Sequence, residues 1–163
     1  MKRLTAAESA GKKGESRVSM LTRSINIISR CAASYRTAHS TEGLPGIYHS
    51  YVFAICLNPG LSQEKLSRHL CINKSNITRH LAYLEENGYI ERRTCEKDKR
   101  ELLVYPTEKM LGAFPEVKRV TREWNALLSE GIDEGELAVF LSVLERLSDR
   151  ARDLLNEGGA NNG

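Results

Sequence analysis

Residues 61–107 read LSQEKLSRHLCINKSNITRHLAYLEENGYIERRTCEKDKRELLVYPT, and this stretch decides the fold. Leu66 and Leu70 lie four residues apart with polar residues between them, so both fall on one face of a short helix. A tight break follows at residues 71–72. Asn73 then stands where the N-cap of a second helix belongs.

The second helix has a clear inward face and a clear end. Its apolar residues are spaced four and three apart: Ile77, Leu81 and Leu84. Gly88 follows at the position where a helix often ends in a left-handed residue. Two short helices joined by a tight turn predict a helix-turn-helix.

A β-hairpin is predicted directly after Gly88. Residues 89–92 and 102–105 are β-prone, the polar residues 94–99 form the loop between them, and Pro106 ends the pairing because it has no N–H to donate. A hairpin appended to a helix-turn-helix is a wing. This wing is rich in basic side chains, with two acidic residues among them: Arg92, Arg93, Lys97, Lys99 and Arg100, against Glu96 and Asp98. A basic loop alone is equally well explained as a solvated charged hairpin, but a helix-turn-helix beside it favours a surface that binds phosphate.

The ordered set of motifs resembles the MarR family of bacterial transcription regulators. The matching residues are Leu66, residues 73–79, residues 84–92, Asp98-Lys99-Arg100 and Thr107-Glu108-Lys109. The resemblance extends more weakly over most of the chain. It implies a mainly α fold with a small β-hairpin wing, in which a winged helix-turn-helix is joined to a helical dimerisation region. In such proteins the first and the last two helices interleave with a second subunit, so we expect a homodimer.

Composition and length leave room for one compact domain with a helical annex. The chain has 163 residues and a formal net charge of only +3, so local charge matters more than the total. No apolar run approaches the roughly 20 residues of a membrane helix, and the N-terminal residues are too polar for a signal peptide. We therefore expect the protein to stay in the cytoplasm. The four cysteines show no CxxC spacing and are interpreted as thiols.

The flanks of residues 47–107, the predicted DNA-binding domain, divide into four segments. Residues 1–16 are expected to form a flexible arm and residues 157–163 a flexible tail. Residues 17–46 carry a narrow apolar stripe on a helix, which suits dimerisation or equally an intrachain packing face. Residues 108–156 are predicted to form the C-terminal dimerisation helices, with a kink or restart at Pro115 and an N-cap at Asp133.

The second helix of the motif supplies the candidate base contacts. Arg79 suits a guanine and Asn76 an adenine, whereas Lys74 is better placed for a phosphate. Ser75 and Thr78 suit either a base or a phosphate. Ser62 and Gln63 open the preceding helix and can offer backbone donors to phosphate, although Ser62 is equally well explained as a plain N-cap.

In the wing, the resemblance implies that Arg100 enters the minor groove and that Asp98 holds the wing in shape. Lys97 and Lys99 are expected to contact phosphates. A dimer would present two modules about one helical turn apart, so the operator is expected to be a pseudo-palindrome with about 10 bp between half-site centres. On the recognition helix, Tyr83 is open to DNA contact or to covering the core, and His80 is interpreted as a packing residue.

Two kinds of switch are considered. The family resemblance implies release of DNA by a small aromatic or anionic effector, and the residues expected near such a pocket are Tyr35, His39, His49 and Tyr51. Aromatic residues on buried helices are more often core. A thiol switch would use Cys95, which lies among basic wing residues that favour the thiolate, whereas Cys56 and Cys71 are expected to be inert.

Other classes of function have less support in the sequence. The chain has no glycine-rich phosphate loop, no HExxH and no nucleophile elbow, so we expect neither an enzyme nor a cofactor. The four histidines have no metal-ligand spacing, and no metal is expected. A winged helix that binds another protein without DNA specificity is the remaining alternative.

Overall fold

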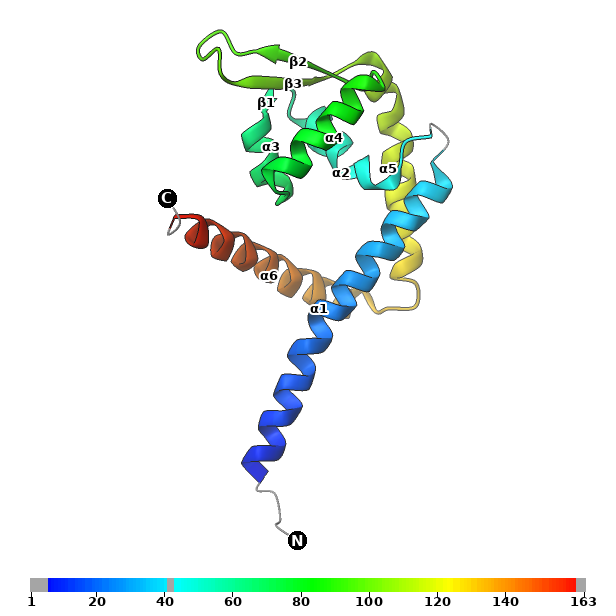
Figure 1. The fold of residues 1–163 in the computed structure, drawn as a ribbon. Coiled ribbons are helices and arrows are strands. Elements are labelled where there is room, and N and C mark those ends of the chain that lie inside the picture. Colours follow the sequence, from blue (N-terminus) through cyan, green and yellow to red (C-terminus); the bar gives the residue numbers. More distant parts are fainter. Residues whose placement is uncertain (1–5, 41–42, 161–163) are drawn as a thin grey trace. The chain divides into compact units, whose positions relative to one another are not determined.

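The computed structural model describes the backbone of residues 6–40 and 43–160, with side chains from residue 20 to residue 155 in these ranges. The chain divides into two compact units, Met1–His49 and Ser50–Gly163. Figure 1 shows the order of their elements. Among the described residues, no helix combines the length and the apolar character that crossing a membrane requires.

The first unit consists of a long helix and a short 3-10 turn that packs on it. The helix α1 spans Ala6–His39, and η1 spans Gly46–Tyr48. Gly46 approaches α1 so closely that a Cβ on it would lie 2.4 Å from the carbonyl oxygen of Ala33. The Gly46 N–H donates to Thr37 Oγ1 at 2.8 Å, and Arg36 Nε donates to the Gly46 carbonyl at 3.3 Å. Only glycine fits this position.

The start of α1 corrects the sequence prediction. The helix already includes Ala6, so the flexible arm predicted for residues 1–16 is wrong from Ala6 onward. Residues 1–5 lie outside the described part of the chain. The segment 6–16 is rich in Ala, Glu and Lys, which favour a helix even where little apolar surface is available for burial.

The second unit is a winged helix-turn-helix followed by two long helices. Its elements are α2 (His49–Leu57, whose first residue still belongs to the first unit), β1 (Leu61–Ser62), α3 (Gln63–Leu70), α4 (Lys74–Glu86), β2 (Ile90–Thr94), β3 (Leu102–Pro106), α5 (Glu108–Leu128) and α6 (Glu134–Ala160). The fold class is mainly α with a small β wing, as predicted.

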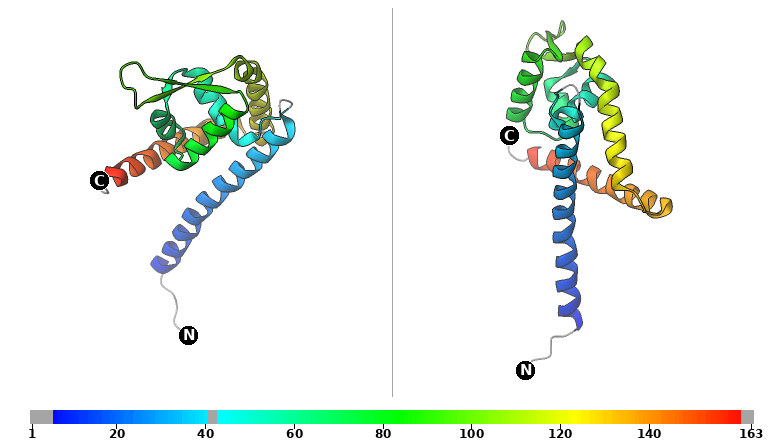
Figure 2. Two further views of the ribbon diagram at one scale, coloured as in Figure 1. Left: turned by 45° about the horizontal axis from the view of Figure 1, so that its top comes forward. Right: turned by 90° about the vertical axis from the view of Figure 1, so that its right-hand side faces the viewer.

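The wing is a three-stranded antiparallel sheet in the order β1-β3-β2. Val104 pairs with Leu61 on one side and with Arg92 on the other. The loop between β2 and β3 projects beyond α3 in each view of Figures 1 and 2. The sequence predicts β2 and β3, but not the two-residue strand β1. Pro106 closes β3 and is its last residue.

The predicted core and caps of the helix-turn-helix are confirmed. Four of its apolar side chains are fully buried: Leu66, Ile77, Leu81 and Leu84. Asn73 caps α4, because its Oδ1 accepts the N–H of Asn76 at 2.8 Å. Gly88 takes the predicted left-handed conformation, with φ of +73°. These features fix the length and the inward face of α4.

The C-terminal helices differ from the prediction in two respects. Helix α5 runs without interruption through Pro115, so the alternative of a restart there is wrong. Helix α6 continues to Ala160, so the flexible tail predicted for residues 157–163 is wrong over residues 157–160, and residues 161–163 lie outside the described part. The predicted cap of α6 is confirmed, since Asp133 Oδ1 accepts the N–H groups of Gly135 and Glu136.

Candidate DNA-binding surface

Helix α4 turns its predicted contact residues away from the core. The side chains of Lys74, Ser75, Thr78 and Arg79 are exposed, and Asn76 is half-buried. Arg79 Nη2 donates to Asn76 Oδ1 at 3.2 Å, so these two side chains already lie against each other. An exposed row of polar residues at the N-terminal end of a helix is the part that reaches base edges in a major groove.

Gln63, at the N-terminus of α3, contacts α4 through its side chain. From the sequence, only its backbone N–H was expected to act as a donor. Gln63 Nε2 donates to Thr78 Oγ1 at 2.7 Å. Ser62 is 2% exposed, and its Oγ accepts the N–H of Lys65 at 3.3 Å. The plain N-cap interpretation of the Ser62 side chain is therefore confirmed.

The wing loop is held by bonds that start at Asp98. Its Oδ1 accepts the N–H of Arg100 at 2.9 Å, and its carbonyl accepts the N–H of Glu101 at 2.9 Å. The Glu101 carbonyl in turn accepts the N–H of Cys95 at 2.9 Å. Asp98 thus holds the loop at the point from which Arg100 leaves the backbone.

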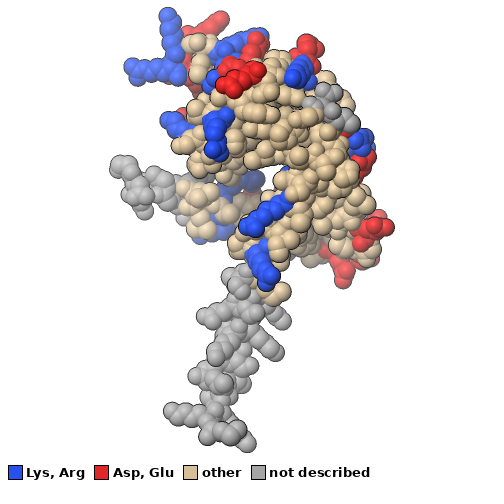
Figure 3. All heavy atoms as spheres, turned by 45° about the vertical axis from the view of Figure 1, so that its right-hand side comes forward, with Lys and Arg blue, Asp and Glu red and all other residues tan. Residues whose placement is uncertain are grey.

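The wing tip presents charges of both signs. Lys97, Lys99 and Arg100 are exposed, and so are Glu96 and Asp98. In the space-filling view, blue side chains project at the top of the molecule with red ones beside them (Figure 3). Since Asp98 bonds to backbone within the loop, the long basic side chains are the ones that can extend toward a polyanion.

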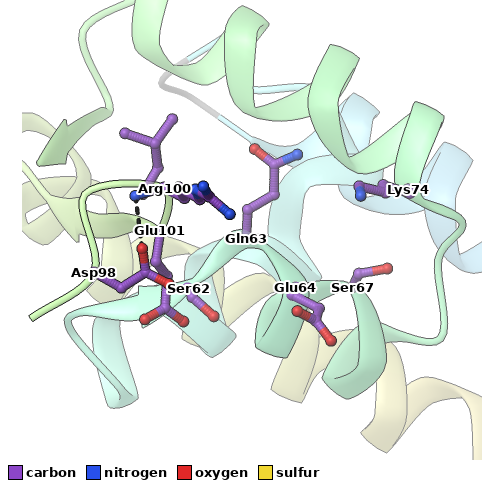
Figure 4. A pocket seen from close by; sticks show the side chains of 9 residues that line it. Ser62, Gln63, Glu64, Ser67, Lys74, Asp98, Arg100 and Glu101 are labelled. Carbon is purple, nitrogen blue, oxygen red and sulfur yellow. Dashed lines mark hydrogen bonds between the residues drawn. The ribbon is translucent and has the colours of Figure 1, made fainter. Parts of the chain in front are cut away.

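A groove of about 520 Å³ lies between the wing and the start of α3. It brings together five of the predicted contact residues, which are Gln63, Lys74, Asp98, Arg100 and the buried Ser62. The other lining residues are Glu64, Ser67, Glu101 and Leu102. Figure 4 shows the Arg100 side chain extending toward Gln63, with Lys74 farther along the groove. The wing arginine and the two helices of the motif therefore share one surface.

Several supporting contacts were not predicted as parts of the site. Arg92 of β2 forms an ion pair with Glu85 of α4, with Nε donating to Glu85 Oε2 at 3.0 Å. The hydrogen bond from Arg92 lowers the pKa of the Glu85 carboxyl, and the same bond raises the pKa of Arg92. Arg93 lies over the Tyr105 ring, 4.7 Å from its centroid. The spacing of these residues in the sequence gives no periodic signal that would pair them.

The residues predicted for an effector site have different surroundings. Tyr35 and His39 stack on α1 with ring centroids 3.9 Å apart. Tyr51 is fully buried, and its hydroxyl lies 2.7 Å from His80 Nδ1. His49 is 2% exposed. The core interpretation fits Tyr51 and His49, and the packing interpretation of His80 is confirmed.

The exposure of Cys71 and Cys95 differs from what their expected reactivities would require. Cys71, expected to be inert in the interhelical turn, is exposed there in a left-handed conformation with φ of +53°. Cys95 is half-buried, and Cys31 is exposed. Burial raises the pKa of the Cys56 thiol, as expected for an unreactive position.

Comparison with known proteins identifies the family. A family model described as "MarR family" matches residues 42–101. A Thauera aromatica protein, described as "Putative transcriptional regulatory protein for hcr operon", is 30% identical over 113 residues, which cover 69% of this chain and 68% of the relative.

Solved structures agree in fold. A Listeria monocytogenes protein assigned to the MarR family, crystallised with a 26mer DNA, has a TM-score of 0.78 and 27% identity, covering 87% of this chain and 95% of that one. A SlyA-like transcription regulator from the same organism has a TM-score of 0.80 and 27% identity, covering 86% and 95%. This chain therefore belongs to the MarR family of transcriptional regulators.

Proposed function

We propose that this regulator binds a pseudo-palindromic operator in double-stranded DNA as a homodimer, represses transcription, and releases the operator when a small ligand binds. The observation that carries the DNA-binding part is the shared surface of α3, α4 and the wing, with Arg100 directed along the groove. Helix α4 would enter the major groove, and Arg100 would enter the adjacent minor groove.

The exposed apolar side chains of α6 support the homodimer. Seven large apolar residues of this helix are at least 41% exposed: Val139, Phe140, Leu141, Val143, Leu147, Leu154 and Leu155. Helix α1 exposes a second set: Met20, Leu21, Ile25, Ile27 and Ile28. A single chain in water rarely leaves this much apolar surface uncovered, so a second copy is the proposed cover.

The effector is proposed to be a small aromatic or anionic molecule. Of the four residues predicted for its site, Tyr35 and His39 best retain that role, because they form a stacked pair with Tyr35 half-buried and His39 exposed. A stacked pair with one exposed imidazole ring can stack on an aromatic ligand and hydrogen-bond to it. A switch based on the Cys95 thiol is the alternative, and that residue is half-buried in the wing loop.

The decisive experiment is selection of bound sequences from random duplex DNA, followed by gel-shift titration of the recovered operator at several salt concentrations. We expect a two-fold symmetric consensus and affinity that falls steeply with added salt. Transcription in vitro from a promoter containing this operator should fall when the protein is added. Binding without a consensus would instead favour the winged helix as an interaction module.

A further inference from the structure

Thr78 is the predicted contact residue of α4 whose hydroxyl hydrogen is already engaged. A threonine hydroxyl has one hydrogen to donate and two lone pairs to accept. Its Oγ1 lies 2.9 Å from the carbonyl oxygen of Lys74, one turn earlier in the same helix. A carbonyl oxygen only accepts, so the single hydroxyl hydrogen of Thr78 is directed at Lys74.

The bond to Lys74 also decides which side chain donates in the contact between Thr78 and Gln63. Because the Thr78 hydroxyl has given its hydrogen to Lys74, it can only accept from Gln63. The Gln63 amide nitrogen lies 2.7 Å from Thr78 Oγ1 and supplies that hydrogen. The two bonds form a chain from Gln63 to Thr78 to the α4 backbone, and they hold the hydroxyl against the helices.

An engaged hydroxyl changes what Thr78 can recognise. Phosphate oxygens and the O6, O4 and N7 atoms of bases are acceptors, and Thr78 has no hydrogen left to give them. The side chain is nevertheless exposed on the face of α4 that carries Arg79 and Ser75. Its methyl group can then contact DNA without competing with these bonds, and the methyl of threonine is suited to contact the C5-methyl of thymine.

We propose that Thr78 reads a thymine through its methyl group, and that Gln63 is the positioning residue that holds Thr78 in the orientation required. This inference rests on the proposed sequence-specific binding of DNA. It assigns an apolar specificity contact to a position that the sequence left open between base and phosphate. It also gives the Gln63 side chain a role in DNA recognition, which it performs by holding Thr78.

The test uses the full-length protein and the operator recovered by selection. Each thymine of one half-site is replaced in turn by deoxyuridine, which lacks only the C5-methyl group. For the unaltered protein, deoxyuridine at one of these positions should weaken binding by about fourfold. This is the change expected for loss of one methyl-sized apolar contact. The same scan is then repeated with three variants, and circular dichroism melting confirms that each is folded.

The first two variants separate the methyl from the hydroxyl. Thr78→Ser keeps the hydroxyl and removes the methyl, so the sensitive position should become insensitive to deoxyuridine. Thr78→Val keeps a methyl and removes the hydroxyl, so sensitivity to deoxyuridine at that position should be retained. A double-mutant cycle that combines each protein substitution with the deoxyuridine substitution separates the methyl contact from any general loss of affinity.

The third variant tests the role of Gln63. Gln63→Met has similar length but gives no hydrogen to Thr78, so the threonine hydroxyl keeps only its bond to the Lys74 carbonyl and is held less firmly. The roughly fourfold effect of deoxyuridine should shrink toward onefold although Thr78 is unchanged. An unchanged effect in this variant would overturn the part assigned to Gln63.

The failures of this inference and of the proposed function are distinguishable. If selection yields no consensus, the proposed function is overturned and this inference with it. If a consensus appears but no thymine is sensitive to deoxyuridine, or if sensitivity persists in Thr78→Ser, only the methyl contact is overturned.

Discussion

Removing the Arg100 side chain is the perturbation with the clearest expected effect on operator binding. Arg100 is exposed at the wing tip and extends along the groove that it shares with Gln63. An arginine in a narrow minor groove interacts with a strongly negative potential. We expect Arg100→Ala to weaken binding by at least about 1 kcal/mol, or roughly fivefold, because one such contact contributes about 1–3 kcal/mol. The variant should remain folded, since this side chain makes no core contact.

Asp98 permits a sharper form of the same test, because it acts on Arg100 through the backbone. Its carboxylate accepts the Arg100 N–H at 2.9 Å, and a hydrogen bond of this kind contributes about 0.5–1.5 kcal/mol. Asp98→Ala should therefore weaken operator binding by roughly two- to tenfold, although it also removes a negative charge that repels DNA. Asp98→Asn is the matched control, since it keeps the acceptor and loses the charge, and it should bind at least as tightly as the unaltered protein.

The assay is a fluorescence anisotropy titration on the selected operator with the two single variants and the double variant. If Asp98 works by positioning Arg100, the Asp98→Ala effect should largely vanish once Arg100 is alanine, which gives a coupling energy of at least about 0.5 kcal/mol. Additive effects would refute the positioning role of Asp98. Unchanged affinity in Arg100→Ala would refute the assignment of the wing arginine itself.

Three further predictions concern stability and assembly. Asn73→Ala removes the cap acceptor that lies 2.8 Å from the Asn76 N–H, so the free energy of unfolding in urea should fall by about 1 kcal/mol, whereas Asn73→Ser should retain most of it. Burial and the charge of Arg79 lower the pKa of His80, so on acidification the unfolded chain takes up a proton that the folded chain resists. Stability should therefore fall between about pH 7.5 and about pH 5.5, and fall less in His80→Gln; equal losses would contradict this. Leu141→Glu, on the exposed apolar face of α6, should convert the proposed dimer to a monomer in light scattering, whereas Ser142→Glu, at an exposed position on the polar side of the same helix, should not; a dimeric Leu141→Glu would argue against α6 as the interface.

The helix-turn-helix was predictable because its signals are local. Three buried residues of α4 follow helical spacing, and the cap at Asn73 and the left-handed Gly88 each lie within one turn of the helix end that they define. The wing strands were predictable for the same reason, since two short β-prone runs flank a polar loop. Each of these signals is contained within a few consecutive residues.

Features that depend on pairs distant in the sequence were missed. The bond from Gln63 to Thr78 joins two helices, and its existence depends on how α3 and α4 pack. Strand β1 has only two residues, too few to show any alternation, and it is a strand only because Leu61 pairs with Val104. The early start of α1 was missed because the prediction relied on apolar spacing, whereas Ala6 and its neighbours favour a helix by propensity alone.

The contacts around Thr107 explain why the wing and the recognition helix present one surface. Thr107 is the N-cap of α5, and its hydroxyl lies 2.7 Å from the carbonyl oxygen of Gly88 and 2.9 Å from that of Tyr89, shortly after the end of α4. Lys109 donates to the Asn87 carbonyl at 2.8 Å, and its ammonium lies 4.3 Å from the centroid of the Tyr89 ring. The end of the wing is thereby joined to its beginning.

The ion pair between Glu85 and Arg92 adds a second connection, from the last turn of α4 to the middle of β2. With β2 attached to α4 through this ion pair, and the start of α5 attached to the turn that follows α4, the wing is held against the helix before any DNA is bound. Because a prearranged surface loses less conformational entropy on binding, more of its contact energy remains as affinity. We therefore expect the Thr-Glu-Lys motif after the wing to support the proposed DNA binding through Thr107 and Lys109, which attach the end of the wing to the turn that follows α4.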